Sequence, residues 1–141
     1  VMNGGRIVQA ASPVEVYRNP TARFVGSFIG NPPMNFLPAT RSASGQWQVA
    51  GKELPGPAAG DALEFAIRPE DLTLAPDGFP ATVRVVEPLG AHTLVTTELD
   101  GRLFRAVLDS DLQLSPGDQL NLLPKPDRIR WFDPETQGAV S

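Results

Sequence analysis

Proline is the residue that most constrains how this chain can fold. Of the 15 prolines, 13 lie after residue 30, among clusters of glycine, aspartate and serine. Proline lacks a backbone donor and interrupts helices, so this density favours short strands and turns over long helices. Charge shifts at the same place, because three arginines and one glutamate give residues 1–30 a net charge of +2. Since the whole chain carries −4, residues 31–141 must carry −6. Both shifts predict a domain boundary near Gly30, between residues 1–30 and 31–141.

Beyond residue 30, apolar and polar residues alternate over short runs bounded by turn residues, which is the pattern of half-buried strands. The predicted strands are Asn35–Thr40, Gln46–Ala50, Leu63–Arg68, Leu72–Leu74, Ala81–Glu87, Thr93–Leu99, Arg102–Leu108, Gln119–Leu122 and Ile129–Phe132. The clearest hairpin signal is Asp100-Gly101, because Asp-Gly supplies the positive φ angles of a two-residue turn. Many short strands with little helical periodicity predict a mainly β chain, folded as a small barrel or sandwich.

Residues 1–30 carry different signals. Two short extended pieces flank Asn3-Gly4-Gly5, which predicts a hairpin near the first residue. Ser12, Pro13 and Glu15 form a helix start with a capping box, so a short helix is expected over residues 13–18. A second amphipathic helix is expected to follow Asn19-Pro20 and to end at Gly30. Its apolar face would consist of Phe24, Val25, Phe28 and Ile29.

The sequence offers little for catalysis or metal binding. There is no cysteine, and His92 is the one histidine, whereas transition-metal sites generally need several nitrogen or sulfur ligands. The one Gly-Lys pair, Gly51-Lys52, does not fit a phosphate-binding loop, and no Gly-x-Ser-x-Gly elbow is present. Asp109-Ser110-Asp111 lacks the further oxygen ligands of a calcium loop and is better interpreted as a solvated turn or a helix start. We therefore predict no catalytic residue and no metal site, and we interpret His92 as an ordinary loop or strand residue.

Composition also limits the partners. The chain has no long uncharged apolar run and no signal-peptide layout, so we expect a soluble protein. The absence of cysteine is compatible with a reducing cytoplasm. A sequence pI of about 4.9 gives no bulk attraction for nucleic acid or for anionic lipid.

Ile67-Arg68-Pro69-Glu70-Asp71-Leu72 forms a charged corner at the end of a predicted strand. One interpretation is a strand-ending turn with a local ion pair. The other is a recognition corner, because an arginine fixed beside a proline can bind carboxylate or carbonyl oxygen in two directions. The sequence leaves both open.

Two further constellations stand out. Val86–His92 joins two strands, with Gly90 relieving backbone strain, and is either a plain connection or a binding loop. At the other end of the chain, the adjacent aromatics Trp131 and Phe132 must face opposite sides of a strand. One of them is expected in the core, and the other would cover a neighbouring segment or subunit.

Several of these stretches carry a resemblance to a known family. The run VMNGGRIVQ, the Pro-x-Glu-Val-Tyr helix and the Phe-Ile-Gly-Asn-Pro-Pro-Met-Asn-Phe stretch resemble the C-terminal part of the ATP-binding subunit of bacterial ABC importers. The similarity is to the sugar and glycerol-phosphate branch, the maltose-type (MalK/UgpC-like) subunits. Ile67–Leu72 resembles that family's Arg-Pro-Glu corner, Val85–Gly90 its Val-Glu-Pro-Leu-Gly loop, and Phe132–Glu135 its terminal Phe-Asp motif.

The resemblance implies a fold and a division of labour. Residues 1–30 would be the last hairpin and helices of a nucleotide-binding domain, with Phe24, Val25, Phe28 and Ile29 docked on the rest of it. Residues 31–141 would be an accessory barrel of the OB-fold type, a TOBE or MOP-like domain. The parent subunit would use ATP and magnesium, whereas this stretch holds none of the ATPase motifs, needs no cofactor and would have no enzyme activity of its own.

The resemblance also implies partners and their contacts. A second copy would pair with the barrel, permease subunits would bind through the nucleotide-binding domain, and a cytoplasmic regulator would dock in some relatives. The location implied is cytoplasmic, peripheral on the inner face of the bacterial plasma membrane. The residues expected to form the interface are Arg68, Pro69, Glu70, Asp71, Glu87, Pro88, Leu89, Gly90, Trp131 and Phe132.

Two functions from other classes remain as alternatives. A barrel of this type would bind a small oxyanion, as related molybdate-binding domains do, with backbone amides and Arg68. It would otherwise bind single-stranded nucleic acid by stacking bases on aromatics over a basic groove. Aromatics are only 7% of the chain and the barrel is acidic, so we expect no nucleic-acid partner.

Overall fold

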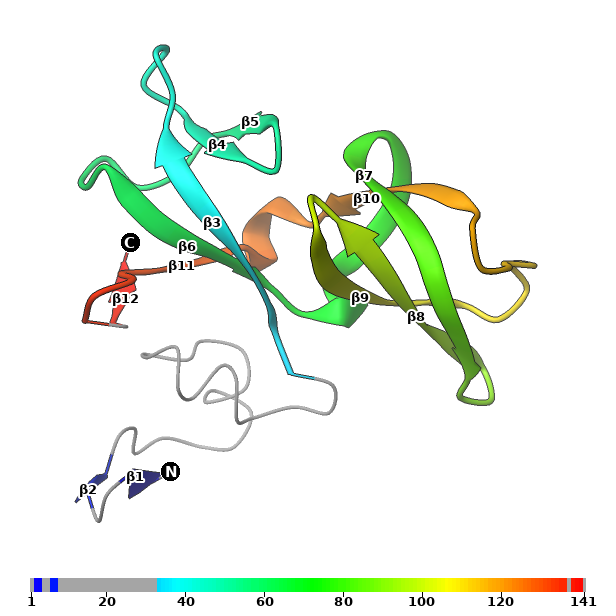
Figure 1. Ribbon diagram of the computed structural model, residues 1–141. Helices are drawn as coiled ribbons and strands as arrows, with labels where there is room; N and C mark the ends of the chain where they lie inside the picture. The colour runs from blue at the N-terminus through cyan, green and yellow to red at the C-terminus, as the bar shows by residue number, and fades with distance from the viewer. Residues whose placement is uncertain (1, 4–5, 8–32, 137, 141) are drawn as a thin grey trace. The chain divides into compact units, whose positions relative to one another are not determined.

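The computed structural model describes residues 2–3, 6–7, 33–136 and 138–140 (Figure 1). The hairpin expected near the first residue is confirmed, since β1 (Met2–Asn3) pairs antiparallel with β2 (Arg6–Ile7). The helix expected over residues 13–18, the second helix with its Phe24, Val25, Phe28 and Ile29 face, and the boundary at Gly30 lie outside the described residues. None of the helices in the described part of the chain has the length and apolar character needed to cross a bilayer.

The described chain is mainly β, as predicted, and divides into two compact units. We call the residues before Ile67 together with those from Arg130 onward the first unit, and Ile67–Ile129 the second unit. The elements after β2 are β3 (Asn35–Arg41), β4 (Trp47–Val49), β5 (Lys52–Leu54), β6 (Ala62–Ile67), the 3-10 turn η1 (Pro69–Asp71), β7 (Leu72–Pro88), β8 (His92–Leu99), β9 (Arg102–Asp109), β10 (Gln119–Pro124), the 3-10 turn η2 (Pro126–Arg128), β11 (Arg130–Phe132) and β12 (Ala139–Val140).

The first unit is built on a sheet with the strand order β12-β11-β6-β3-β4-β5. The short strand β5 was not predicted. It follows a two-residue turn in which Ala50 and Gly51 both have positive φ angles, of 49° and 82°. Such turns normally carry Asn-Gly or Asp-Gly, so Ala50 concealed the signal. Strand β12 was also missed, because two residues are too few to show periodicity.

Aromatic side chains fill the core of the first unit. The Trp47 and Trp131 ring centroids lie 5.8 Å apart, and the Phe65 and Trp131 rings form a T-shaped pair with centroids 5.7 Å apart. On the other side of β11, Phe132 packs with Met34 and Ala66. Since each large apolar side chain that leaves water contributes about 1.5–3 kcal/mol, these rings account for much of this unit's stability.

The second unit is built on a sheet with the order β10-β7-β8-β9, whose strands lie side by side in Figure 1. The hairpin predicted at Asp100-Gly101 is confirmed, with Leu99 opposite Arg102 across the turn. The second unit's core is lined by alternate residues of these strands, among them Val83, Val95 and Phe104, which are fully buried. The polar residues between them therefore face the other side of the sheet.

Strand β7 differs from the prediction of two separate strands, Leu72–Leu74 and Ala81–Glu87. Pro76-Asp77-Gly78 reads as a turn, but the backbone stays extended through it and the pairing with β10 shifts register between Asn121 and Leu122. Prolines are tolerated at such irregularities because little ladder pairing is lost there. Gly78 passes so close to β10 that a Cβ atom on it would lie 2.5 Å from the carbonyl carbon of Leu122.

Candidate interaction site

The Arg68 corner forms at the start of the second unit. Arg68 is extended, with φ −73° and ψ 147°, as expected for a residue before proline, and Pro69 then opens the 3-10 turn η1. The turn closes through the Asp71 backbone N–H, which donates to the Arg68 carbonyl oxygen at 3.0 Å. The Arg68 side chain is only 3% exposed and Pro69 is buried, whereas Glu70 is exposed. Of the first two predicted interface residues, neither presents its side chain to solvent.

Burial and nearby charge shape the ionisation of this corner. Burial lowers the pKa of Arg68 to about 10, and the negative charge of Asp71 opposes part of that effect, so the guanidinium stays charged at neutral pH. The pKa of Glu70 is raised, first by partial loss of solvent around its carboxyl and then by Asp71, against the opposing effects of its own backbone N–H and of Lys125. Two carboxylates and two cations therefore influence one another here.

A second turn, η2, completes the corner and was not predicted. The Lys125 backbone N–H donates to the Asp71 carbonyl oxygen at 2.9 Å, which joins η2 to η1. A signal for it exists in the sequence, because Lys125-Pro126-Asp127 repeats the basic-proline-acidic order of Arg68-Pro69-Glu70. Proline at the first position of both turns fixes φ for a 3-10 start.

The Glu87–Gly90 loop lies at the tip of the β7–β8 hairpin in the same unit. Glu87 and Pro88 end β7, and the Leu89 backbone N–H donates to the His92 carbonyl oxygen at 2.7 Å. Leu89 is 55% exposed, and Gly90 has a φ of +84° with nothing within 4 Å of a Cβ position. His92 is an exposed residue of β8, in agreement with its interpretation as an ordinary strand residue. A role for this loop in binding stays a prediction.

The Trp131-Phe132 pair belongs to the first unit. The two rings face opposite sides of β11 and both are buried, Trp131 with 8% and Phe132 with 0% of its surface exposed. Asp133, which follows them, holds the β11–β12 connection, because its carboxylate accepts from the backbone N–H groups of Glu135 and Thr136. The aromatic pair therefore packs within its own chain. Its role in an interface stays a prediction.

Arg41 is a structural residue that sequence reasoning missed. Its guanidinium lies 4.3 Å from the centre of the Trp47 ring and donates to four backbone carbonyl oxygens of the loops around it. These acceptors are Gly45, Pro57, Ala58 and Gly60, at 2.8 to 3.3 Å. Trp47 Nε1 also donates to Pro57, at 2.9 Å. Arg41 thus fixes the proline- and glycine-rich loop before β6, and no local pattern marks an arginine that reaches residues 16 to 19 positions away.

Asp109-Ser110-Asp111 forms the turn after β9, in agreement with its interpretation as a solvated turn. The Asp109 carboxylate accepts from the Asp111 backbone N–H at 3.0 Å, and the Asp109 carbonyl oxygen accepts from Leu112. All of these residues are exposed.

An open groove of about 360 Å³ lies on the second unit, between β7 and β10. It is lined by Leu74, Ala75, Pro76, Gln119, Leu120 and Asn121. None of these six side chains is charged. The groove therefore lacks a cation with which to hold a small oxyanion.

The predicted residues thus fall into two groups. Arg68, Pro69, Glu70 and Asp71 share the second unit with the Glu87–Gly90 loop, whereas Trp131 and Phe132 belong to the first. Only Glu70 and the loop offer well-exposed side chains. Phe24, Val25, Phe28 and Ile29 lie outside the described residues.

Comparison with known proteins finds similarity to one family model and to the ATP-binding proteins of ABC transporters. The family model described as "TOBE domain" matches residues 65–132. An uncharacterised ABC transporter ATP-binding protein of Sinorhizobium fredii is 40% identical, over 100% of this chain and 40% of its own length. The sn-glycerol-3-phosphate import ATP-binding proteins UgpC of Ralstonia nicotianae and Ruegeria pomeroyi are 35% and 37% identical, over 99% and 100% of this chain. The chain spans about two fifths of the length of these relatives, 40% to 43%.

Among solved structures, the cytoplasmic molybdate-binding protein ModG, with molybdate bound, is similar with a TM-score of 0.54 and 17% identity. The match covers 71% of this chain and 96% of that one. At this identity the likeness concerns the fold alone. It agrees with the predicted OB-type barrel.

Proposed function

We propose that this chain is the non-catalytic regulatory and dimerisation part of an ABC transporter ATP-binding subunit. The chain carries a TOBE domain and is related to such ATP-binding proteins. The transporter would be an importer of sugars or glycerol phosphate. Similarity to the two UgpC proteins over almost the whole chain carries the proposal. The remaining part of the parent subunit would hold the ATPase motifs and contact the permease. The whole complex would lie at the cytoplasmic face of the membrane.

The mechanism that follows needs no chemistry from the barrel. Two copies in contact keep the attached ATPase domains at a high effective concentration, so that closing around ATP becomes an intramolecular step. Even a weak contact is sufficient for this, because the linkage multiplies the affinity of the pair. Regulation would act by strengthening or weakening the contact, and a cytoplasmic regulator that covers it would slow import.

The exposed parts of the second unit are the reasonable place for such a contact. Glu70 and the Glu87–Gly90 loop are accessible, whereas Arg68 and Pro69 support the corner from inside. Trp131 and Phe132 would contribute indirectly, by holding β11 in place.

Sedimentation equilibrium on residues 1–141, beside a chain that begins at Asn31, tests the proposal. Both chains should dimerise with similar affinity, since the barrel carries the contact. Dimerisation of the longer chain alone would place the contact in residues 1–30, and monomers of both chains at about 100 μM would rule out a self-contact of even the weak class.

Calorimetric titration with molybdate, sulfate and glycerol phosphate tests the oxyanion alternative. We expect no heat of binding, because Arg68 is buried and the open groove has no charged lining. Saturable binding of any of the three anions at one site per chain would favour the alternative instead.

A further inference from the structure

One face of the second unit's sheet is partly exposed and combines apolar with charged side chains around Thr96, which is itself buried with 8% of its surface exposed. Cross-strand pairing places its residues in three rows, which we call the exposed sheet face. The rows are Thr82, Glu98 and Leu103; Val85, Thr96 and Arg105; and Glu87, Leu94 and Val107. Val85 is 46% exposed on β7, which pairs on both sides, and Leu103, the second residue of the edge strand β9, is 60% exposed.

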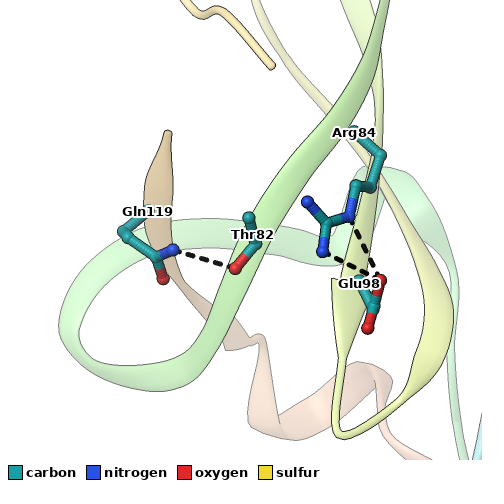
Figure 2. Close-up of polar contacts among 4 residues, drawn as sticks. All are labelled: Thr82, Arg84, Glu98 and Gln119. Atoms are coloured by element: carbon teal, nitrogen blue, oxygen red, sulfur yellow. Dashed lines mark hydrogen bonds and ion pairs between the residues drawn. The ribbon is translucent and has the colours of Figure 1, made fainter. Parts of the chain in front are cut away.

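A β-bulge adds a charged pair to this face. The register of β7 against β8 shifts between Val83 and Val85, which leaves Arg84 as the extra residue. A bulge re-aims the side chain that it carries. Here Arg84 is turned toward Glu98, and its Nε and Nη2 donate to Glu98 Oε2 at 3.1 and 3.0 Å (Figure 2). Figure 2 also shows Gln119 donating to the hydroxyl of Thr82 at 2.9 Å, which extends the polar row to β10.

The charges of the face balance, whereas those of the chain do not. Arg84 and Arg105 offset Glu87 and Glu98, while the chain as a whole carries −4. A strongly acidic or basic partner would gain nothing from a face without net charge. A second copy of the same face can place its arginines against the glutamates of the first, as an isologous contact requires.

We infer that the exposed sheet face binds the same face of a second copy around a twofold axis, with Val85 and Leu103 packed in the contact and Arg84 and Glu98 beside them. The inference rests on the proposed function and specifies its interface. The exposed Leu89 and Glu87 of the hairpin loop continue this face at one end.

The size of the face sets the strength expected of the contact. Three strands spaced by about 4.8 Å, with three rows about 7 Å apart, span roughly 15 by 20 Å, or about 300 Å² on each copy. This is the size of weak, transient interfaces rather than of permanent dimers. The isolated chain should therefore dimerise with a dissociation constant of about 1 to 100 μM.

Sedimentation equilibrium on residues 1–141 with Leu103→Glu tests the inference. The matched control is Leu112→Glu, which adds the same charge at an apolar residue of the second unit that is 38% exposed and lies outside the face. Because a glutamate within the contact would lose solvent without gaining a partner cation, Leu103→Glu should weaken dimerisation by about tenfold or more, and Leu112→Glu by less than about twofold. Thermal unfolding should be unchanged in both variants, since both positions are exposed.

The outcomes separate the inference from the proposed function. A wild-type chain that stays monomeric contradicts both. If the wild type dimerises and the Leu103→Glu and Leu112→Glu variants have the same dissociation constant, the exposed sheet face is overturned alone. The self-contact then lies elsewhere. Dimerisation that Val85→Glu also weakens by about tenfold would support the face at a second position.

Discussion

Among the residues that the structure describes, the first unit buries most of its large apolar side chains, whereas the second leaves some of its own in solvent. Trp47, Phe65 and Phe132 have no exposed surface, and the half-buried Arg41 closes the loop beside them. In the second unit Val85 and Leu103 are about half exposed, at 46% and 60%, on paired strands. The contrast indicates that the apolar side chains of the first unit stabilise its own core, while the second unit combines a core with a surface that is suited to a partner.

The largest effect expected from breaking this contrast is at Trp131. Trp131→Ala removes a ring that is 8% exposed and packs against both Trp47 and Phe65, so it should cost about 3–5 kcal/mol of unfolding free energy. Leu103→Ala, the control in the second unit, should change it by less than about 0.5 kcal/mol. Urea denaturation measures both values, and equal losses would contradict the contrast.

Arg41 tests how far the first unit depends on a single polar residue. Arg41→Lys keeps the charge but cannot reach several carbonyl oxygens at once, so it should destabilise by about 1–3 kcal/mol. Hydrogen exchange should then show faster exchange at Gly45 and in the loop of residues 55–61. Unchanged exchange rates there would mean that the loop is stable without the hydrogen bonds from Arg41.

Gly78 makes the corresponding test in the second unit. A Cβ atom there would lie 2.5 Å and 2.7 Å from the backbone carbon and nitrogen of Leu122, which cannot move aside as a side chain would. Gly78→Ala should therefore cost about 1–3 kcal/mol. In Gly138→Ala the nearest atom is a side-chain oxygen at 3.4 Å, so this matched control should change thermal unfolding little. A Gly78→Ala chain as stable as wild type would place β7 farther from β10.

Two turns provide the smallest test. Ala50-Gly51 in the first unit and Asp100-Gly101 in the second both connect strands with two residues at positive φ. Ala50→Asn should stabilise by about 0.5–1 kcal/mol, because asparagine tolerates the left-handed region that alanine avoids. Asp100→Ala should destabilise by a similar amount. Opposite shifts of the melting temperature are expected, and shifts of the same sign would contradict this account of the turns.

Local patterns predicted much of this fold. The hairpin at Asp100-Gly101 and most strand positions follow from alternation and from turn residues, which act within a few positions of one another. Strand β5 was missed because Ala50 holds a turn without the usual residue, and β7 was divided because Pro76-Asp77-Gly78 imitates a turn. Both errors arise where tertiary packing overrides a local preference.

The candidate site was less predictable than the fold. Charged corners and loops could be named from residue types, but burial could not, and Arg68 proved to be a buried support rather than an exposed ligand. The exposed sheet face was missed because it needs the register of three strands and a bulge at Arg84. No single segment of sequence contains that information.

Hydroxyl-radical footprinting at two protein concentrations, below and above the onset of dimerisation, tests most directly the central claim that the second unit carries a surface for a partner. Leu103 and Val85 should become less reactive at the higher concentration, while Leu112 and Leu74, exposed apolar residues outside the face, should not change. Equal reactivity of Leu103 and Val85 at both concentrations, in a chain that dimerises, would contradict the account.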